Sequence, residues 1–355
     1  MRARSSTRTV LGSSVLLLVT LSGCAGLPSE PIPGEPAHHV RGGYRNTAAD
    51  FHRASSWTRF KFLVSRSWQS LVSPRTFDTP RESAAGLAEG QTLLAGAAPT
   101  ITWIGHASLL VRVDGVTVLT DPHWSERASP LSWAGPRRLV PPGIPFESLP
   151  KVDVVVLSHD HYDHLDLPTL QRLAKEHDPL FVVPLGLKAW LAEREVTRVE
   201  ERDWWGRVEH RGLTFVCTPA QHFSQRTPWD QNRRLWATWA VLGPSRRLYF
   251  TGDTGYFDQF KEIGARLGPF DLAAVAIGAY LPAAIMRSVH LTPEQGVQVA
   301  EDVGARVMLG IHWGTFDLAE EPLGAPPERM RAETARRAIG PERAWILKIG
   351  ETRRW

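Results

Sequence analysis

The chain has 355 residues, of which 43% are apolar and 22% charged, so it is long and apolar enough for a globular core and is not disordered throughout. The formal net charge of +4 depends on residues 1–23, which contain Arg2, Arg4 and Arg8 and no acidic residue. Without this segment, 38 basic residues face 37 acidic ones and no Lys/Arg run stands out, so we expect no nucleic-acid partner.

The N-terminus has the pattern of a secretory leader. A basic stretch, Met1–Arg8, precedes an apolar stretch, Val10–Leu21, that is too short to span a membrane comfortably. The sequence Leu21-Ser22-Gly23-Cys24 resembles the lipobox of bacterial lipoproteins, which implies cleavage before Cys24 and acylation of its thiol. We therefore expect a protein anchored in the bacterial cell envelope, on the periplasmic face of the outer membrane because Ala25 follows the cysteine; an ordinary secretory signal is the alternative.

Residues 24–98 are predicted to be a tether and an N-terminal extension. The stretch Ala25–Tyr44 is rich in Pro and Gly, so we expect it to be poorly ordered. Between Ala48 and Leu71, apolar residues recur at spacings of three and four, which predicts an amphipathic helix. Packing on the core is the favoured interpretation of this helix, and a membrane-facing surface helix is the alternative. Residues 73–98 show no period and are predicted to be a loop.

The folded domain is predicted to cover residues 99–355. Strands at Ser108–Val113 and Val116–Thr120 flank Asp114-Gly115, a strong hairpin signal. Other strands are predicted at Ile101–Ile104, Val152–Leu157, Leu180–Pro184, Leu213–Thr218, Trp236–Leu242, Arg247–Thr251, Leu272–Ile277 and Arg306–Ile311. Helices are predicted at Leu167–Glu176, Leu185–Arg194, Pro293–Val303 and Pro327–Ala338. Hairpins followed by alternating strands and helices predict a layered α/β fold with mixed sheets.

The segment Ser158-His159-Asp160-His161-Tyr162-Asp163-His164 directly follows a predicted buried strand. Alternate residues of an extended segment point the same way, so His159 and His161 can bind one cation. Asp163 and His164 lie beyond the turn and can bind a second cation. A polar loop in which Asp163 or Asp166 only caps the following helix is the alternative.

Three further candidate ligands follow later predicted strands: His222, Asp253 and His312. Each is weak evidence alone, because a single histidine after a strand is more often structural. Together with the first motif, they provide enough groups for two metal ions on a rigid scaffold. Cys217 lies in an apolar strand pattern and is assigned no chemistry, and with Cys24 acylated no internal disulfide is possible.

At these residues the chain resembles a known family. The order Asp121, His159-x-His161-x-Asp163-His164, His222, Asp253, His312 is similar to the metallo-β-lactamase superfamily, which implies an α/β fold, an αββα sandwich of two mixed β-sheets flanked by helices. Further motifs resemble N-acylphosphatidylethanolamine-hydrolysing phospholipase D. They include Thr102–Ala107, Leu119–Pro122, Gly252–Tyr256, Gly268–Asp271, Ile277–Tyr280 and Ile311–Phe316. The similarity covers about residues 99–321.

The resemblance implies two zinc ions, or another divalent metal. One ion would be bound by His159, His161, His222 and Asp253. The other would be bound by Asp163, His164, Asp253 and His312. Asp253 would bridge them, and His290 would contact the substrate phosphate or protonate the leaving group. Asp121 and His106 are expected to orient ligands, with a merely structural role as the alternative for His106, and Tyr162 is expected to point away from both metals.

Two metal ions that share a water can deprotonate it and stabilise an in-line displacement at phosphorus. The resemblance implies a phospholipid substrate of the N-acylphosphatidylethanolamine type, cleaved by a metal-bridging hydroxide to phosphatidic acid and N-acylethanolamine. It also makes a homodimer possible. Tryptophans around His222 are candidates for an acyl cleft, for the membrane interface or for core packing. Arg226, Arg233 and Arg234 are candidates for phosphate contacts, and solvated side chains are the alternative. The alternatives are another hydrolase of this fold, such as a lactonase or a different phosphodiesterase, and a non-catalytic zinc protein.

Overall fold

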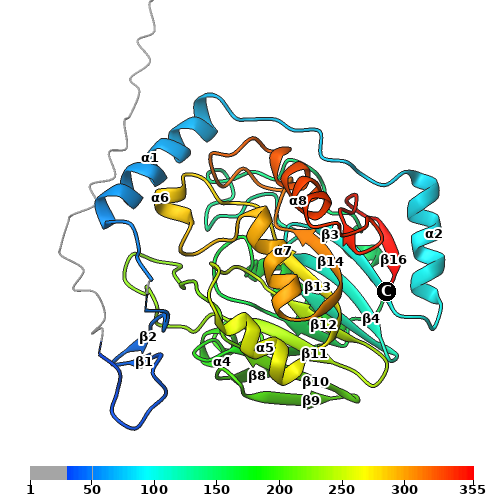
Figure 1. The fold of residues 1–355 in the computed structure, drawn as a ribbon, viewed down its shortest axis with the longest axis horizontal. Helices are drawn as coiled ribbons and strands as arrows, with labels where there is room; N and C mark the ends of the chain where they lie inside the picture. The colour runs from blue at the N-terminus through cyan, green and yellow to red at the C-terminus, as the bar shows by residue number, and fades with distance from the viewer. Residues whose placement is uncertain (1–29, 50) are drawn as a thin grey trace, which may run out of the picture.

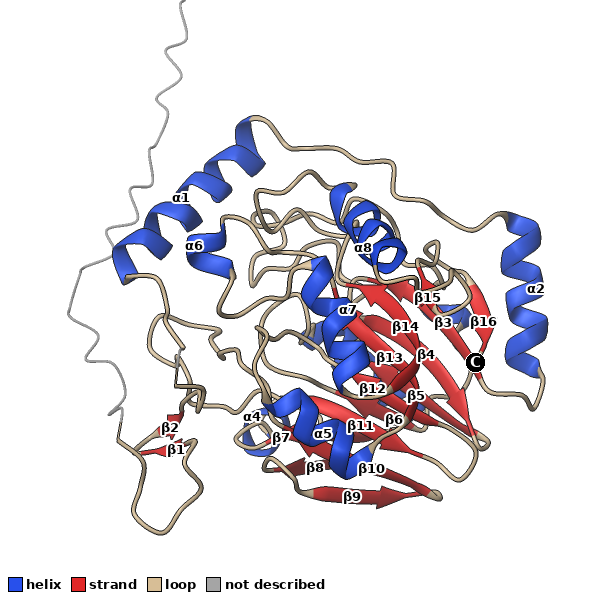
Figure 2. Cartoon of the chain, in the orientation of Figure 1, coloured by secondary structure: helices blue, strands red, loops and turns tan. Residues whose placement is uncertain are grey.

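Two seven-stranded β-sheets share a hydrophobic core in the centre of the molecule (Figure 2). The structure is a computed structural model that describes residues 30–49 and 51–355. The first sheet has the order β16-β3-β4-β5-β6-β7-β8, and the second has the order β15-β14-β13-β12-β11-β10-β9.

The strands of the first sheet are β3 (Thr100–Gly105), β4 (Ser108–Val113), β5 (Val116–Thr120), β6 (Val154–Val156), β7 (Leu180–Pro184), β8 (Val199–Arg202) and β16 (Thr352–Arg354). The strands of the second sheet are β9 (Arg207–His210), β10 (Leu213–Thr218), β11 (Thr238–Leu242), β12 (Arg247–Phe250), β13 (Phe270–Ala276), β14 (Ala305–Ile311) and β15 (Ala344–Trp345). Each sheet is antiparallel in one half and parallel in the other.

The pairing brings the carboxyl ends of several strands to shared sheet edges. In the first sheet β5 and β6 are parallel neighbours. In the second sheet β12, β13 and β14 are parallel, and β10 runs in the same direction as β12 because two antiparallel pairings separate them. Loops after these strands can therefore meet in space, as the predicted ligand positions require.

The strand β6 shows why the apolar runs of this chain do not alternate with polar residues. Val154 and Val156 join the core between the sheets, whereas Val155 joins a second core under the helices that flank the first sheet. A strand that is buried on both faces reads as a continuous β-branched run.

The helices lie on the outer faces of the sheets and at the periphery (Figure 1). They are α1 (Ser56–Val72), α2 (Ala84–Ala95), α3 (Leu167–His177), α4 (Lys188–Ala192), α5 (Gln259–Leu267), α6 (Ala283–Met286), α7 (Pro293–Asp302) and α8 (Ala325–Arg336), with a short 3-10 helix at Phe146–Ser148. In the view of Figure 1, α5, α7 and α8 lie in front of the second sheet. Leu170 and Leu173 of α3 pack on the first sheet. The predicted αββα sandwich is therefore confirmed.

Several element predictions were wrong. Residues 73–98 are not one loop, because Ser83 caps α2, whose Ala- and Gly-rich sequence carries little helical periodicity. The helix predicted over Leu185–Arg194 is shorter in the structure, where α4 covers only Lys188–Ala192. It cannot begin earlier because Gly186 has a φ of +85°, which is not a helical conformation. The strands β8 and β9 were missed because they are mostly polar edge sequences, Val-Glu-Glu-Arg and Arg-Val-Glu-His.

The N-terminal extension is also better ordered than its composition predicts. Strands β1 (His39–Val40) and β2 (Gly43–Tyr44) form a short ribbon. The Asp203 carboxylate holds this ribbon on the core, accepting hydrogen bonds from His38 Nε2 at 2.6 Å and His39 Nε2 at 2.9 Å. The prediction of a poorly ordered tether is therefore wrong for residues 30–44. The leader and Cys24 lie outside the described residues.

Candidate metal centre

The predicted ligands all lie just beyond the carboxyl ends of strands. The metal motif (Ser158–His164) follows β6, and Asp121 directly follows β5. His222, Asp253 and His312 follow β10, β12 and β14 of the other sheet. The structure brings these segments from both sheets together at one site.

The first cluster consists of His159, His161 and His222, whose ring nitrogens converge. His161 Nδ1 lies 2.8 Å from His159 Nε2 and 3.2 Å from His222 Nε2. Asp253 Oδ2 lies 4.0 Å from His159 Nε2 and 3.9 Å from His222 Nε2. Three imidazoles and one carboxylate thus surround one point, which is a donor set that zinc accepts.

The second cluster consists of Asp163, His164 and His312, on the other side of Asp253. Asp253 Oδ2 lies 3.2 Å from His164 Nε2, and Asp253 Oδ1 lies 3.0 Å from His312 Nε2. Asp163 Oδ2 lies 3.4 and 3.5 Å from the same two nitrogens. Asp253 therefore takes part in both clusters, the position expected of a bridging carboxylate.

The imidazoles are oriented by partners on their other ring nitrogen. His164 Nδ1 donates to Asp121 Oδ2 at 2.6 Å, and His222 Nδ1 donates to the Val289 carbonyl at 2.8 Å. Both contacts direct Nε2 toward the cluster, where it can bind a metal ion when it carries no proton. Asp121 thus occupies the orienting position that was expected of it.

One orienting residue was missed by sequence reasoning. The Asn46 side chain donates to the His222 carbonyl at 2.7 Å and accepts from the His222 amide at 3.0 Å. It therefore fixes the backbone of a cluster residue from the N-terminal extension. No local pattern marks Asn46, since the contact spans 176 positions of the sequence.

The backbone at the site adopts conformations that side-chain-bearing residues rarely take. His106, Asp121 and His312 have φ values of 53°, 33° and 64°. Gly252, beside Asp253, has a φ of +49°, and a Cβ there would lie 2.3 Å from the Ser158 Cβ. Such strained positions cluster at functional sites, where the surrounding structure holds them in place.

The electrostatics of the site are dominated by buried carboxylates. Burial lowers the pKa of His159, His161 and His222, so the first cluster is neutral. Burial alone would raise the pKa of Asp163 and Asp253, but the imidazoles beside them, led by His164, hold both pKa values well below the ordinary one.

The same coupling acts on the histidines of the second cluster. Burial alone would lower the pKa of His164 and His312, but the nearby carboxylates, led by Asp253, raise the pKa of His164 well above its ordinary value and that of His312 to about 9. In the part of the chain that the structure describes, no Lys or Arg forms an ion pair with Asp121, Asp163 or Asp253. Protons on imidazoles are thus the positive charge that offsets these carboxylates.

The residues present fit divalent cations. Asp253 Oδ1 and His290 Nδ1 are buried and form no hydrogen bond within the described residues. Buried polar atoms are normally satisfied, so these groups point to a missing partner. Divalent cations in the clusters would supply that partner for Asp253 Oδ1 and would replace the imidazole protons as the positive charge, whereas His290 belongs to neither ligand set.

His290 lies beside both clusters, just before α7. Its Nδ1 is 3.7 Å from Asp253 Oδ2, and its ring centroid is 5.2 Å from that of His222. Burial lowers the pKa of His290 to about 4, so the ring is neutral at pH 7. The predicted position of His290 near the site therefore agrees with the structure.

His106 and Tyr162 also lie where they were expected. His106 Nε2 contacts Asp163 Oδ2 at 2.9 Å, so it orients that carboxylate. The Tyr162 hydroxyl donates to the Arg226 carbonyl at 3.0 Å, away from the clusters. His123 is buried against Arg138 and the Phe316 ring and does not join either cluster.

The arginines near His222 are mostly structural. Arg226 donates to the carbonyls of Asp160 and Leu165, and Arg234 donates to the Asp160 carboxylate at 2.5 Å. Asp160, to which no role was assigned from the sequence, is thus the buried anchor of this loop. Arg233 is exposed. A phosphate-binding role is therefore not favoured for Arg226 or Arg234.

The tryptophans around His222 do not form an acyl cleft. Trp236 and Trp239 are fully buried in the core between the sheets, and Trp204 donates to the Trp236 carbonyl. Trp205 packs beneath Arg266, whereas Trp229 is exposed. Core packing is thus the main role of this group.

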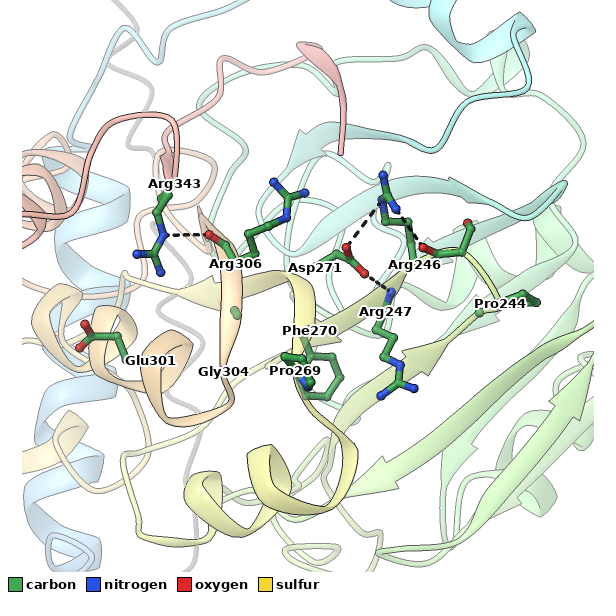
Figure 3. A pocket seen from close by; sticks show the side chains of 13 residues that line it. Pro244, Arg246, Arg247, Pro269, Phe270, Asp271, Glu301, Gly304, Arg306 and Arg343 are labelled. Carbon is green, nitrogen blue, oxygen red and sulfur yellow. Dashed lines mark hydrogen bonds and ion pairs between the residues drawn. The ribbon is translucent and has the colours of Figure 1, made fainter.

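A groove of about 740 Å³ lies at the opposite edge of the second sheet (Figure 3). It is lined by residues at the amino ends of β12, β13 and β14, among them Arg247, Phe270 and Arg306. The guanidinium groups of Arg246, Arg247, Arg306 and Arg343 point in different directions in Figure 3, so they do not converge on one anion. The metal clusters, not this groove, are the candidate active site.

Comparisons with known proteins agree with this geometry. The "Beta-lactamase superfamily domain" matches residues 116–313. The chain is 47% identical over 228 residues to N-acyl-phosphatidylethanolamine-hydrolyzing phospholipase D 1 of Caenorhabditis elegans, covering 61% of this chain and 64% of that protein. It is 32% identical over 236 residues to the mitochondrial N-acyl-phosphatidylethanolamine-hydrolyzing phospholipase D of Saccharomyces cerevisiae, covering 64% and 50% of the two chains. The chain therefore spans less than two thirds of the length of these relatives.

A solved structure shows the same fold. A possible metal-dependent hydrolase from Veillonella parvula has a TM-score of 0.59 and 17% identity, over 73% of this chain and 100% of that chain. The family match covers more than half of the 355 residues and contains all of the cluster residues. The chain belongs to the metallo-β-lactamase superfamily.

Proposed function

We propose that the protein is a metal-dependent hydrolase that cleaves N-acylphosphatidylethanolamine-like phospholipids to phosphatidic acid and N-acylethanolamine. The observation that carries the proposal is the position of Asp253 between two clusters of buried imidazole and carboxylate groups. The phospholipase D activity is a property that the names of the relatives give to those proteins. The 47% identity is the support for transferring the substrate class to this chain.

Two zinc ions are the cofactor we propose. His159, His161, His222 and Asp253 would bind one of them, and Asp163, His164, His312 and Asp253 the other. When bound, such ions supply a nucleophilic hydroxide at neutral pH and offset negative charge on a phosphate. Borderline imidazole and hard carboxylate ligands suit zinc, although other divalent ions accept the same donors.

The open side of the site indicates how the substrate would enter. His159, His164, His222 and Asp253 are sealed in the interior, whereas the side chains of Asp163 and His290 are 15% and 12% exposed. A phosphodiester would therefore approach between Asp163 and His290. There the free Nδ1 of His290 would hydrogen-bond to a phosphate oxygen or to the departing alcohol, and Asp163 would accept a proton from the attacking water.

The test uses purified full-length protein with N-acylphosphatidylethanolamine, phosphatidylethanolamine and a β-lactam as separate substrates. We expect phosphatidic acid and N-acylethanolamine from the first lipid, detected by mass spectrometry. His161→Ala should abolish them, because it removes the nitrogen shared by the contacts of the first cluster. His210→Ala, on the strand β9 and outside both clusters, is the matched control and should keep the activity. If the protein hydrolyses neither N-acylphosphatidylethanolamine nor phosphatidylethanolamine, the proposal is refuted.

We further propose that the protein is a lipoprotein of the bacterial envelope. The support is the basic and apolar leader followed by Leu21-Ser22-Gly23-Cys24, which lies outside the described residues. No helix among residues 30–49 and 51–355 has the length and apolar character needed to cross a bilayer. Radioactive palmitate should label the wild type and not Cys24→Ser, and labelling that persists in the variant would contradict the anchor.

A further inference from the structure

The helix α1 is attached to the protein through its polar side. Thr58, Phe62, Arg66 and Gln69 face the molecule, and Phe62 is the one apolar residue among them. Arg66 pairs with the Asp317 carboxylate and donates to the Asp317 carbonyl at 3.2 Å. A surface helix of a globular protein normally buries its apolar side instead.

The apolar side of α1 faces away from the protein. At about 100° per residue, Trp57, Phe60, Val64, Trp68 and Val72 form one stripe roughly 120° wide. Their exposed fractions are 60%, 44%, 51%, 66% and 56%, and that of the adjacent Leu63 is 62%. Figure 2 shows α1 at the periphery, standing off the sheets. The favoured prediction that this helix buries its apolar residues on the core is therefore wrong.

The charge of this segment complements an anionic surface. Residues 51–77 contain five Lys or Arg residues and no Asp or Glu, and two of the five, Arg66 and Arg75, pair with Asp317. Lys61 lies on the stripe side, is exposed, and reaches over the Trp57 ring at 5.8 Å from its centroid. Exposed tryptophan beside lysine is the composition of helices that lie in a membrane interface.

The helix also lies next to the metal centre. Phe62 packs against a small cluster formed by Ala279, Met286 of α6 and Ala319, and the amide of His290 donates to the Met286 carbonyl at 2.8 Å. Just before α1, the Arg53 guanidinium lies 3.7 Å from the centroid of the Phe223 ring, which in turn packs on His161. The segment 51–72 thus touches the elements that carry both sides of the site.

We propose that α1 docks the protein on the surface of an anionic phospholipid bilayer, with Trp57, Phe60, Val64 and Trp68 in the interface and the metal centre beside it. This contact is separate from an acyl anchor at Cys24, because it fixes the orientation of the folded domain rather than tethering it. The link to catalysis rests on the proposed function, since a lipid substrate would enter from the same membrane. Docking itself does not depend on the chemistry.

The test measures where the α1 tryptophans lie in vesicles that contain no N-acylated lipid. Full-length protein is mixed with phosphatidylcholine–phosphatidylglycerol vesicles whose acyl chains are brominated, and quenching of tryptophan fluorescence is recorded. We expect quenching of the wild type, and loss of most of it in Trp57→Ser/Trp68→Ser. Membrane attachment is not the readout, so an acyl anchor does not mask the result.

The matched control is Trp133→Ser/Trp229→Ser, which removes two tryptophans of similar exposure, 72% and 77%, from loops outside α1. It should keep the quenching. Lys61→Glu should weaken the preference for phosphatidylglycerol, whereas Lys175→Glu, the same charge change on α3, should not. Equal losses of quenching in both tryptophan pairs, or none in the wild type, would overturn the proposal.

A second copy of the chain is the other partner that such an apolar side could cover. In that case sedimentation without vesicles would show a dimer that Trp57→Ser/Trp68→Ser dissociates, and the wild type would not be quenched. That outcome also overturns membrane docking.

Activity separates this proposal from the proposed function. Trp57→Ser/Trp68→Ser should lower hydrolysis of N-acylphosphatidylethanolamine in vesicles by about tenfold or more, since two large apolar contacts with the bilayer are lost. It should leave hydrolysis of a short-chain monomeric analogue unchanged. If the wild type hydrolyses neither substrate but brominated lipid still quenches its tryptophan fluorescence, the proposed function is refuted and the proposal that α1 docks on the bilayer is retained.

Discussion

The Asp121 carboxylate is the part of the site whose removal gives the sharpest prediction. It is fully buried, and its Oδ2 accepts hydrogen bonds from Ser158 Oγ at 2.6 Å and from His164 Nδ1 at 2.6 Å. Its Oδ1 accepts from the Ser158 amide at 2.7 Å. In Asp121→Asn, an amide NH₂ must replace one of these acceptors, so at least one buried donor loses its partner.

The size of the effect follows from these contacts. A buried donor without a partner costs about 1–3 kcal/mol, which corresponds to roughly 5- to 150-fold in an equilibrium constant. His164 can avoid this cost by moving its proton to Nε2, which faces Asp253 at 3.2 Å and would then no longer bind metal. Partners of this kind typically change metal affinity by about 10- to 100-fold. We expect zinc binding to weaken by about that factor.

The assay is competition for zinc with a chromophoric chelator, together with circular dichroism to verify folding. The matched control is Asp166→Asn, another buried carboxylate, which bonds Ser125 and Thr169 and takes no part in either cluster. It should leave zinc affinity within a few-fold of the wild type. A folded Asp121→Asn protein with wild-type zinc affinity would refute the assigned role of Asp121.

Three further predictions follow from single contacts. The Asp253→Ala variant should lose both its bound metal and its hydrolytic activity, because the Asp253 carboxylate belongs to both clusters. A metal content equal to that of the wild type, measured by elemental analysis, would contradict the bridging position of Asp253. Gly252→Ala should lower the free energy of unfolding by about 1–3 kcal/mol, because residue 252 has a φ of +49° and the added Cβ would clash with Ser158. Gly212→Ala is the control for backbone strain alone, because residue 212 has a φ of +83° but open space around it. Equal losses of stability in the two variants would refute the clash. Burial alone would raise the pKa of Asp203, but the neighbouring histidines, led by His38, lower that pKa below its ordinary value of 3.8. The ionised carboxylate therefore stabilises the N-terminal ribbon at pH values above 3.8, and this stabilisation is lost as the pH falls through the lowered pKa. The protection of the amides of residues 38–45 from hydrogen exchange, relative to the intrinsic rate at each pH, should therefore fall in acid, and Asp203→Asn should lower this protection at pH 7.

The strands of the core were predictable because strands that are buried on both faces appear in the sequence as continuous apolar runs. Leu180–Pro184 and Leu213–Thr218 were predicted at the bounds that the structure shows, and Asp114-Gly115 forms the predicted hairpin turn. The edge strands β8 and β9 were not predicted, because half-exposed polar strands resemble loops in their composition. The ribbon at β1 and β2 was missed because Asp203, which holds it, lies more than 160 positions away.

The residues that form the two clusters were predictable for a similar reason. Four of the cluster residues lie within Ser158–His164, where chance rarely places so many histidines and acids, and the others directly follow apolar strands. The partners that orient them were harder to find. Asp121 was expected from the family pattern, whereas the contact of Asn46 with His222 has no local signature.

By itself, the sequence determined the set of candidate metal-binding groups, the strands that carry them and the superfamily to which the chain belongs. Only the tertiary structure decided that Asp253 stands between the two clusters, that Asn46 reaches His222, and that α1 turns its tryptophans outward. The physical reason is range. Burial and ligand chemistry depend on residue type and local spacing, whereas the partner of a side chain depends on which distant segments the sheets bring together.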